Sequence, residues 1–95
     1  MGAFSANSGN MRQVASDVQN YQKKYVDVVS QIESEINHLG GLWNGPVYDQ
    51  LKQMFNEKKP GLNEGSDLMV EFYQKLNNAA DSFDSAEKSI LSRFQ

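Results

Sequence analysis

The apolar residues in the first half of the chain recur at the spacing of an α-helix. They lie three or four positions apart between residues 11 and 39, without interruption. This is the period at which one face of a helix repeats. We therefore predict one long helix over about residues 10–39. Its apolar stripe consists of Met11, Val14, Val18, Tyr21, Tyr25, Val28, Ile32, Ile36 and Leu39.

The residues before this helix are small and mostly polar, and we assign residues 1–9 to a flexible leader. Asn10 has the form of a capping box because Gln13 follows three positions later. Ser8 and Ser5 are alternative caps, and either of them would start the helix earlier.

Two glycines, Gly40 and Gly41, predict the end of the first helix. A glycine after the last apolar position commonly ends a helix because it adopts the left-handed conformation without a Cβ clash. We assign residues 40–45 to a turn, which contains Trp43-Asn44-Gly45. Pro46 fits the first turn of a following helix, where the N–H that proline lacks would have no partner.

The second half of the chain has a stricter pattern, in which an apolar residue recurs every seven positions. A sustained seven-residue repeat is typical of a helix packed in a left-handed, coiled-coil-like bundle. We therefore predict a second helix over about residues 46–93, with the repeat forming its core and dimer contact. The repeat consists of Tyr48, Phe55, Leu62, Met69, Leu76, Phe83 and Ile90.

Pro60 interrupts the second helix without shifting this repeat. Proline inside a helix clashes with the carbonyl group four residues earlier and costs about 3 kcal/mol. Because the repeat keeps its phase across Pro60, we predict a kink near residues 56–66 and no domain boundary. A separate helix that begins at Ser66 and Asp67 is the alternative.

The predicted fold class is all-α, a helical hairpin of two long antiparallel helices in a single domain over residues 10–95. Both apolar stripes are wider than one seam between two helices requires, since Val29 lies beside the first stripe and the second is widened by Leu51, Phe72, Tyr73 and Leu91. A chain of 95 residues is also marginal as a monomer. We therefore expect dimerisation into a four-helix bundle, most simply with a second copy.

The composition argues against nucleic-acid binding, metal binding and catalysis. Nine basic and twelve acidic side chains give a net charge of −3, so no basic surface for nucleic acid is expected. The chain has no cysteine and one histidine, His38, which leaves no thiolate or histidine cluster for a metal ion. No serine has a neighbouring base. We expect no catalytic residue, no metal, no cofactor and no enzymatic activity.

Neither a membrane span nor a signal peptide is expected from the sequence. The longest apolar run is far shorter than the ~20 residues that cross a bilayer, and the first residues lack a basic start and an apolar core. We expect the chain to be made in the cytoplasm. Binding to a membrane surface stays open, because apolar stripes that bind a partner can also bind lipid.

A chain of about a hundred residues with two long helices, no cysteine and Trp43-Asn44-Gly45 in the turn resembles the WXG100 (ESAT-6-like) family over its whole length. The resemblance implies secretion without a signal peptide by a type VII (ESX) secretion system, whose membrane ATPase would be a partner. It also implies a homodimer, or a heterodimer with another WXG100-like chain or a toxin N-terminal domain. Such a protein would act by protein–protein binding, as an effector or co-secreted partner, in virulence or interbacterial competition.

The chain departs from the family at the end of its second helix. Many members carry Tyr-x-x-x-Asp/Glu there as part of the export signal, but Tyr73 is followed by Asn77 at the acidic position. The nearest variant is Phe83 with Glu87, an aromatic residue and an acid one turn apart. Two alternatives therefore stay open: an escort or chaperone-like partner of a larger type VII toxin, and a cytosolic coiled-coil adaptor.

Overall fold

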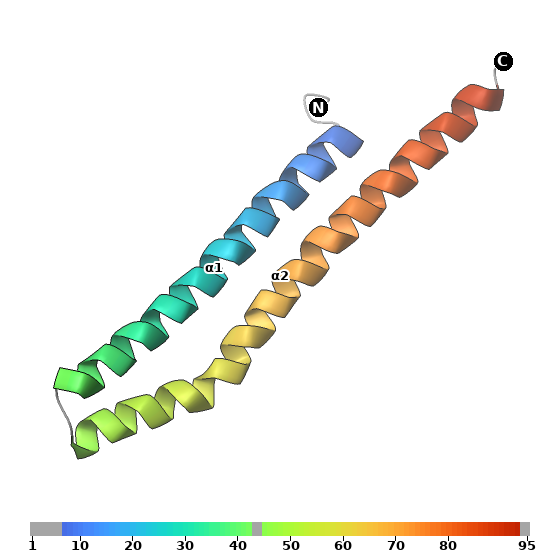
Figure 1. Ribbon diagram of the computed structural model, residues 1–95. Helices are drawn as coiled ribbons and strands as arrows, with labels where there is room; N and C mark the ends of the chain where they lie inside the picture. Colours follow the sequence, from blue (N-terminus) through green and yellow to red (C-terminus); the bar gives the residue numbers. More distant parts are fainter. Residues whose placement is uncertain (1–6, 43–44, 94–95) are drawn as a thin grey trace, which may run out of the picture. The chain divides into compact units, whose positions relative to one another are not determined.

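The structure is a computed structural model that describes residues 7–42 and 45–93, and these form two α-helices (Figure 1). Helix α1 comprises Ser8–Leu42 and helix α2 comprises Pro46–Arg93. Within these ranges no strand is present. The predicted all-α helical hairpin is confirmed. Neither helix of the described residues is apolar enough along its length to cross a membrane.

Helix α1 begins earlier than Asn10, because Asn7 caps it. The Asn7 side chain accepts a hydrogen bond from the backbone N–H of Asn10 at 2.8 Å, and the Asn7 carbonyl accepts one from the N–H of Met11 at 3.0 Å. A side-chain oxygen that accepts the N–H three residues later is the usual N-cap arrangement. Ser8 and Gly9, assigned to the leader from the sequence, therefore belong to α1.

Helix α1 continues through Gly40 and Gly41 to Leu42 instead of ending at the glycines. No glycine in the described residues has a positive φ, so neither of these two acts as a left-handed cap. The ring of Tyr48 lies against Gly40 and occupies the space that a Cβ would need. Gly40 therefore allows the close approach of an α2 side chain.

The chain divides into two compact units, each with a segment of both helices. Unit 1 contains residues 1–20 and 69–95, and unit 2 contains residues 21–68. In unit 2, Nζ of Lys59 donates to the Glu33 carboxylate at 2.9 Å. Farther from the turn, Nε2 of Gln22 donates to Oγ of Ser66 at 2.8 Å. Partner numbers rise along α2 as they fall along α1, so the two segments are antiparallel.

Pro60 lies inside α2, which is continuous from Pro46 to Arg93. Ser66 and Asp67 consequently lie within the same helix and do not begin a new one. Figure 1 shows α2 changing direction in its yellow stretch, within unit 2. A proline that removes one backbone hydrogen bond and clashes with the preceding turn is a common cause of such a bend.

In unit 1, ion pairs join the beginning of α1 to α2. Nη2 of Arg12 donates to Oδ1 of Asp81 at 2.8 Å and to Oδ2 of Asp84 at 2.9 Å. Ala15 on α1 and Ala80 on α2 are almost inaccessible to solvent. Small side chains at these positions allow the two helix segments to lie close together.

Candidate functional site

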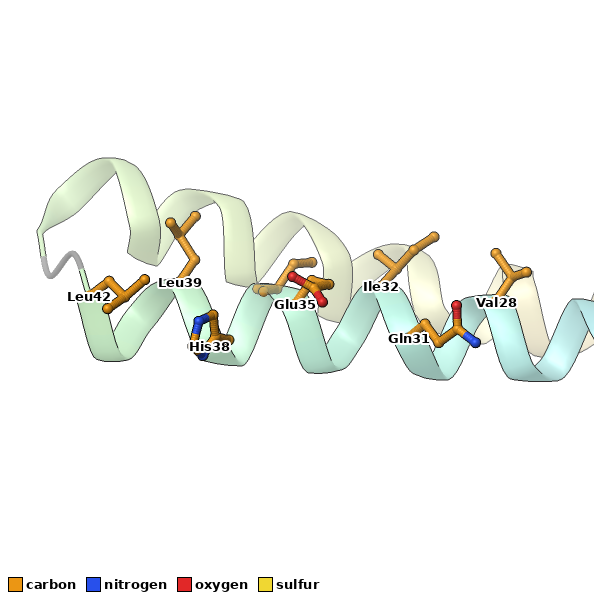
Figure 2. Close-up of a pocket in the computed structure, with 8 residues that line it drawn as sticks. Val28, Gln31, Ile32, Glu35, His38, Leu39 and Leu42 are labelled. Atoms are coloured by element: carbon orange, nitrogen blue, oxygen red, sulfur yellow. The ribbon is translucent and has the colours of Figure 1, made fainter.

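A group of apolar side chains on α1 in unit 2 is exposed to solvent (Figure 2). Val28 is 52% exposed and Leu42 is 74% exposed. In Figure 2, Val28, Ile32 and Leu39 rise from the same side of the helix, and the polar side chains lie along the edge of the group. Together they line an open groove of about 520 Å³. We call this surface the α1 face; it consists of Val28, Gln31, Ile32, Glu35, Ile36, His38, Leu39 and Leu42.

The α1 face exists because α2 covers a different line of residues. In unit 2, Gln22, Tyr25 and Val29 are half-buried, whereas Tyr21, Val28 and Ile32 are exposed. The two lines are one position apart along the helix, or about 100° around it. In this unit, α2 therefore leaves uncovered much of the apolar stripe that the sequence predicts for α1.

The seven-residue repeat of α2 changes from covered to exposed along the helix. Phe55 is buried, and Tyr48, Leu62, Met69 and Leu76 are half-buried. The last two members, Phe83 and Ile90, are exposed. The reason is the length of α1, because Arg12, only five residues into that helix, already pairs with Asp81 and Asp84. The described side chains of α2 after Asp84 are all exposed.

The exposed end of α2 forms a second apolar surface, within unit 1. Ile90 is 53% exposed and Leu91 is 60% exposed. We call this surface the tail face; it consists of Phe83, Ala86, Glu87, Ile90 and Leu91. The candidate export-signal variant, Phe83 with Glu87, lies on this face, and both residues are exposed. Tyr73, the last tyrosine of the chain, is half-buried.

Of the Trp-x-Gly motif, Gly45 is described and lies directly before α2. Its carbonyl accepts the backbone N–H of Asp49 at 3.1 Å, so Gly45 is at the N-cap position of the helix. Trp43 and Asn44 lie outside the described residues.

The Arg12 ion pairs were not singled out from the sequence. Hydrogen bonds to Asp81 and Asp84 raise the pKa of the Arg12 guanidinium. A hydrogen bond from Ser8, together with the one from Arg12, lowers the pKa of the Asp84 carboxyl. These ion pairs could have been predicted from the antiparallel pairing of the helices, which places the first turns of α1 beside the acidic residues at 81 and 84. These contacts hold the beginning of α1 against α2 in unit 1.

No catalytic arrangement is apparent in residues 7–42 and 45–93. These residues contain no group of three or more histidine or acidic side chains placed to hold a metal ion. His38 lies at the polar edge of the α1 face. The expectation that the protein is not an enzyme stays a prediction.

Two paired helices with exposed apolar faces define a helical-hairpin protein. The family model "Proteins of 100 residues with WXG" (WXG100) matches residues 3–88, and the chain belongs to this family. The fold is also similar to that of EsxA from Geobacillus thermodenitrificans (crystal form I), with a TM-score of 0.86 and 20% sequence identity. That similarity covers 94% of this chain and 98% of the EsxA chain. No curated protein matches the sequence significantly.

The resemblance to the WXG100 (ESAT-6-like) family is thus confirmed by both the family match and the fold. Together they support a type VII secreted, ESAT-6-like protein.

Proposed function

We propose that the protein is a substrate of a type VII (ESX) secretion system, exported as a dimer, and that it acts by binding other proteins without catalysing a reaction. Membership of the WXG100 family supports the export route. The absence of a metal-binding group among the described side chains agrees with a binding role, as does the chain's lack of cysteine.

The exposed α1 face is the observation that best supports a dimer. Within the described residues, Ala15, Phe55 and Ala80 are the only buried apolar residues, so the hairpin alone has a very small core. Fully burying one large aliphatic side chain contributes about 1.5–3 kcal/mol. Covering Val28, Ile32 and Leu42 with partner helices therefore supplies stability that one hairpin lacks.

A second copy is the simplest partner, because a two-fold axis brings the same face of both chains together and completes a four-helix bundle. A heterodimer with another WXG100-like chain, or with the helical N-terminal domain of a toxin, uses the same face. In either case the membrane ATPase of the secretion system is the proposed receptor for export.

The oligomeric state of the purified chain tests the dimer. Light scattering should give a mass of twice 10.7 kDa for the wild type. Ile32→Lys should lower this mass towards that of a monomer, because it places a charge in the α1 face. Asn37→Lys is the matched control, since Asn37 is exposed on α1 outside that face, and it should stay dimeric. A wild-type chain that is monomeric at tens of micromolar contradicts the homodimer.

Export itself is tested in the cell that makes the protein. The chain should accumulate in the medium when the type VII ATPase is intact and remain in the cells when that ATPase is deleted. Equal amounts in the medium of both strains contradict the proposed route.

An escort of a larger type VII toxin is the second candidate, and the altered tail motif favours it. The chain has Asn77 where the family motif requires an acid four residues after a tyrosine, so a partner chain would supply that part of the signal. Co-expression with a toxin encoded next to the gene should then yield a one-to-one complex. Export of the chain when every such neighbour is deleted contradicts this role.

A further inference from the structure

A series of apolar residues on α1 in unit 2 is spaced symmetrically about residue 30. Val28 lies two residues before this point and Ile32 lies two residues after it. Tyr21 lies nine residues before it and Leu39 lies nine residues after it. Tyr21, Val28 and Ile32 are exposed, and Leu39 is half-buried and lines the α1 face. The series is therefore the same when α1 is followed from either end.

A symmetric series suits a second copy of α1 that runs antiparallel to the first. A two-fold axis makes every contact occur twice, because each residue and its equivalent exchange places. With that axis beside residue 30, Val28 lies opposite the partner's Ile32, and Tyr21 lies opposite the partner's Leu39. A parallel copy would place each residue opposite itself, and apolar side chains would again lie opposite apolar ones. The charged side chains have to distinguish the two orientations.

Two charged side chains follow the same symmetry. Glu35 belongs to the α1 face, and Lys24 lies about one turn before Val28 on the same side of the helix; both are exposed. The midpoint between them falls between residues 29 and 30, beside the centre of the apolar series. Eleven residues make about three turns, so the two side chains point in nearly the same direction but lie about 16 Å apart along the helix. They are too far apart to pair within one chain.

Covering Glu35 with a partner helix requires a cation beside it. A carboxylate that loses its water is costly unless an opposite charge compensates it. In the antiparallel alignment Lys24 lies opposite the partner's Glu35, whereas a parallel alignment would place two Glu35 carboxylates together. The ion pairs among the described residues use Arg12, Lys59 and Lys75 as cations, so Lys24 is available to a partner.

We propose that two copies of the chain pair through their α1 faces in antiparallel orientation, with the two-fold axis beside residue 30 and Lys24 of each chain bound to Glu35 of the other. These ion pairs select the orientation and the register that the apolar residues alone leave open. The inference rests on the proposed dimer and adds the residues that determine which second chain it accepts. A helix without an acid and a base at the matching places would be accepted less well.

Charge reversal tests the pairing. Lys24→Glu and Glu35→Lys should each raise the dissociation constant of the dimer roughly tenfold or more, because two ion pairs are lost and two like-charge contacts replace them. The double variant Lys24→Glu/Glu35→Lys should return to within about threefold of the wild type, since both pairs form again with exchanged signs. Sedimentation over a dilution series gives the dissociation constants, and circular dichroism checks that the helices are retained.

Lys23 provides the matched control. It is exposed and lies about 100° around α1 from Lys24, away from the α1 face. Lys23→Glu should change the dissociation constant little. Lys23→Glu/Glu35→Lys should pair as weakly as Glu35→Lys alone, although its net charge equals that of the double variant that restores pairing. Equal rescue by both double variants overturns the proposal, as do single variants that pair as tightly as the wild type.

A zero-length cross-link reports the register in the wild-type protein. A carbodiimide should join the Lys24 amine to the Glu35 carboxylate. In a mixture of isotope-labelled and unlabelled chains, linked peptides that combine one labelled with one unlabelled partner should appear. A dimer without this link overturns the register and leaves the dimer of the proposed function standing. A wild-type chain that stays monomeric contradicts both.

Discussion

The ring of Tyr48 lies against Gly40, where the two helices approach each other in unit 2, and leaves no room for a Cβ at residue 40. Gly41, the next residue, has no side chain within 4 Å of its own Cβ position. Two adjacent glycines in the same helix thus have different environments. Only Gly40 is required for packing.

Alanine substitutions should separate these two glycines. Gly41→Ala should raise the free energy of unfolding by up to about 1 kcal/mol, because alanine is the better helix former. Gly40→Ala should lower it by about 1–3 kcal/mol, the usual cost of overpacking, because the Tyr48 ring must move. Denaturant unfolding at one fixed protein concentration measures both. In a Tyr48→Ala background, Gly40→Ala should no longer be destabilising, and a cost that persists there would place its origin elsewhere.

Two phenylalanines of α2 should differ strongly in their contribution to stability. Phe55 is buried in unit 2, so Phe55→Ala should cost about 3–5 kcal/mol of unfolding free energy. Phe72 is exposed, and Phe72→Ala should cost much less. Thermal unfolding followed by circular dichroism compares the two variants. Similar losses would show that a partner covers Phe72 in the assembled protein.

The hydrogen bonds of Asp84 predict a pH dependence in acid. The pKa of Asp84 is lowered in the folded chain, so its ionised form stabilises the fold above the ordinary carboxyl pKa of 3.8. That contribution is lost as the pH falls below this value through the lowered folded pKa. Asp84→Asn should therefore be less stable than the wild type at neutral pH, and the difference should vanish in strong acid.

Asp27→Asn is the control for this measurement, because Asp27 is an exposed acid on α1. Its difference from the wild type at neutral pH should be small. A stability difference for Asp84→Asn that is the same at pH 2 and pH 7 contradicts the assigned role of the Asp84 carboxylate.

Export should depend on the turn motif and, to a smaller degree, on the acid of the tail face. Trp43→Ala and Glu87→Ala should lower the secreted fraction while leaving a helical dimer. Glu64→Ala is the control, because Glu64 is an exposed acid of α2 away from both features. Immunoblots of medium and cells, with circular dichroism of the purified variants, provide the measurement. Normal secretion of folded Trp43→Ala removes a recognition role from the turn.

The existence of both helices was predictable, because each has an apolar period sustained over many turns. The N-terminal end of α1 was missed because Asn7 caps the helix three residues before the predicted capping box at Asn10. The C-terminal end of α1 was missed because, in the sequence, a glycine that makes room for a neighbouring ring looks the same as a glycine that ends a helix. Gly40 shows that only the partner side chain, Tyr48, distinguishes the two cases.

The line of α1 that faces α2 was not predictable from apolar character. The sequence favours Val14 and Tyr21, whereas the structure covers their neighbours Ala15 and Gln22. A small side chain at 15 permits close approach, and the amide at 22 is satisfied by Ser66. Apolar periodicity identifies a helix but does not choose between two adjacent lines when close packing and a hydrogen bond favour the less apolar one. The same ambiguity concealed the α1 face.

The hydrogen bond between Gln22 and Ser66 has a consequence for how the chain can mispair. Sliding one helix past the other by a full seven-residue repeat would leave most apolar contacts of the repeat intact. It would also separate the half-buried Gln22 amide from the Ser66 hydroxyl and so remove their hydrogen bond, which contributes about 0.5–1.5 kcal/mol. The pair therefore helps to specify the register of the two helices. It adds little to the total stability, but it favours one alignment of two otherwise repetitive helices.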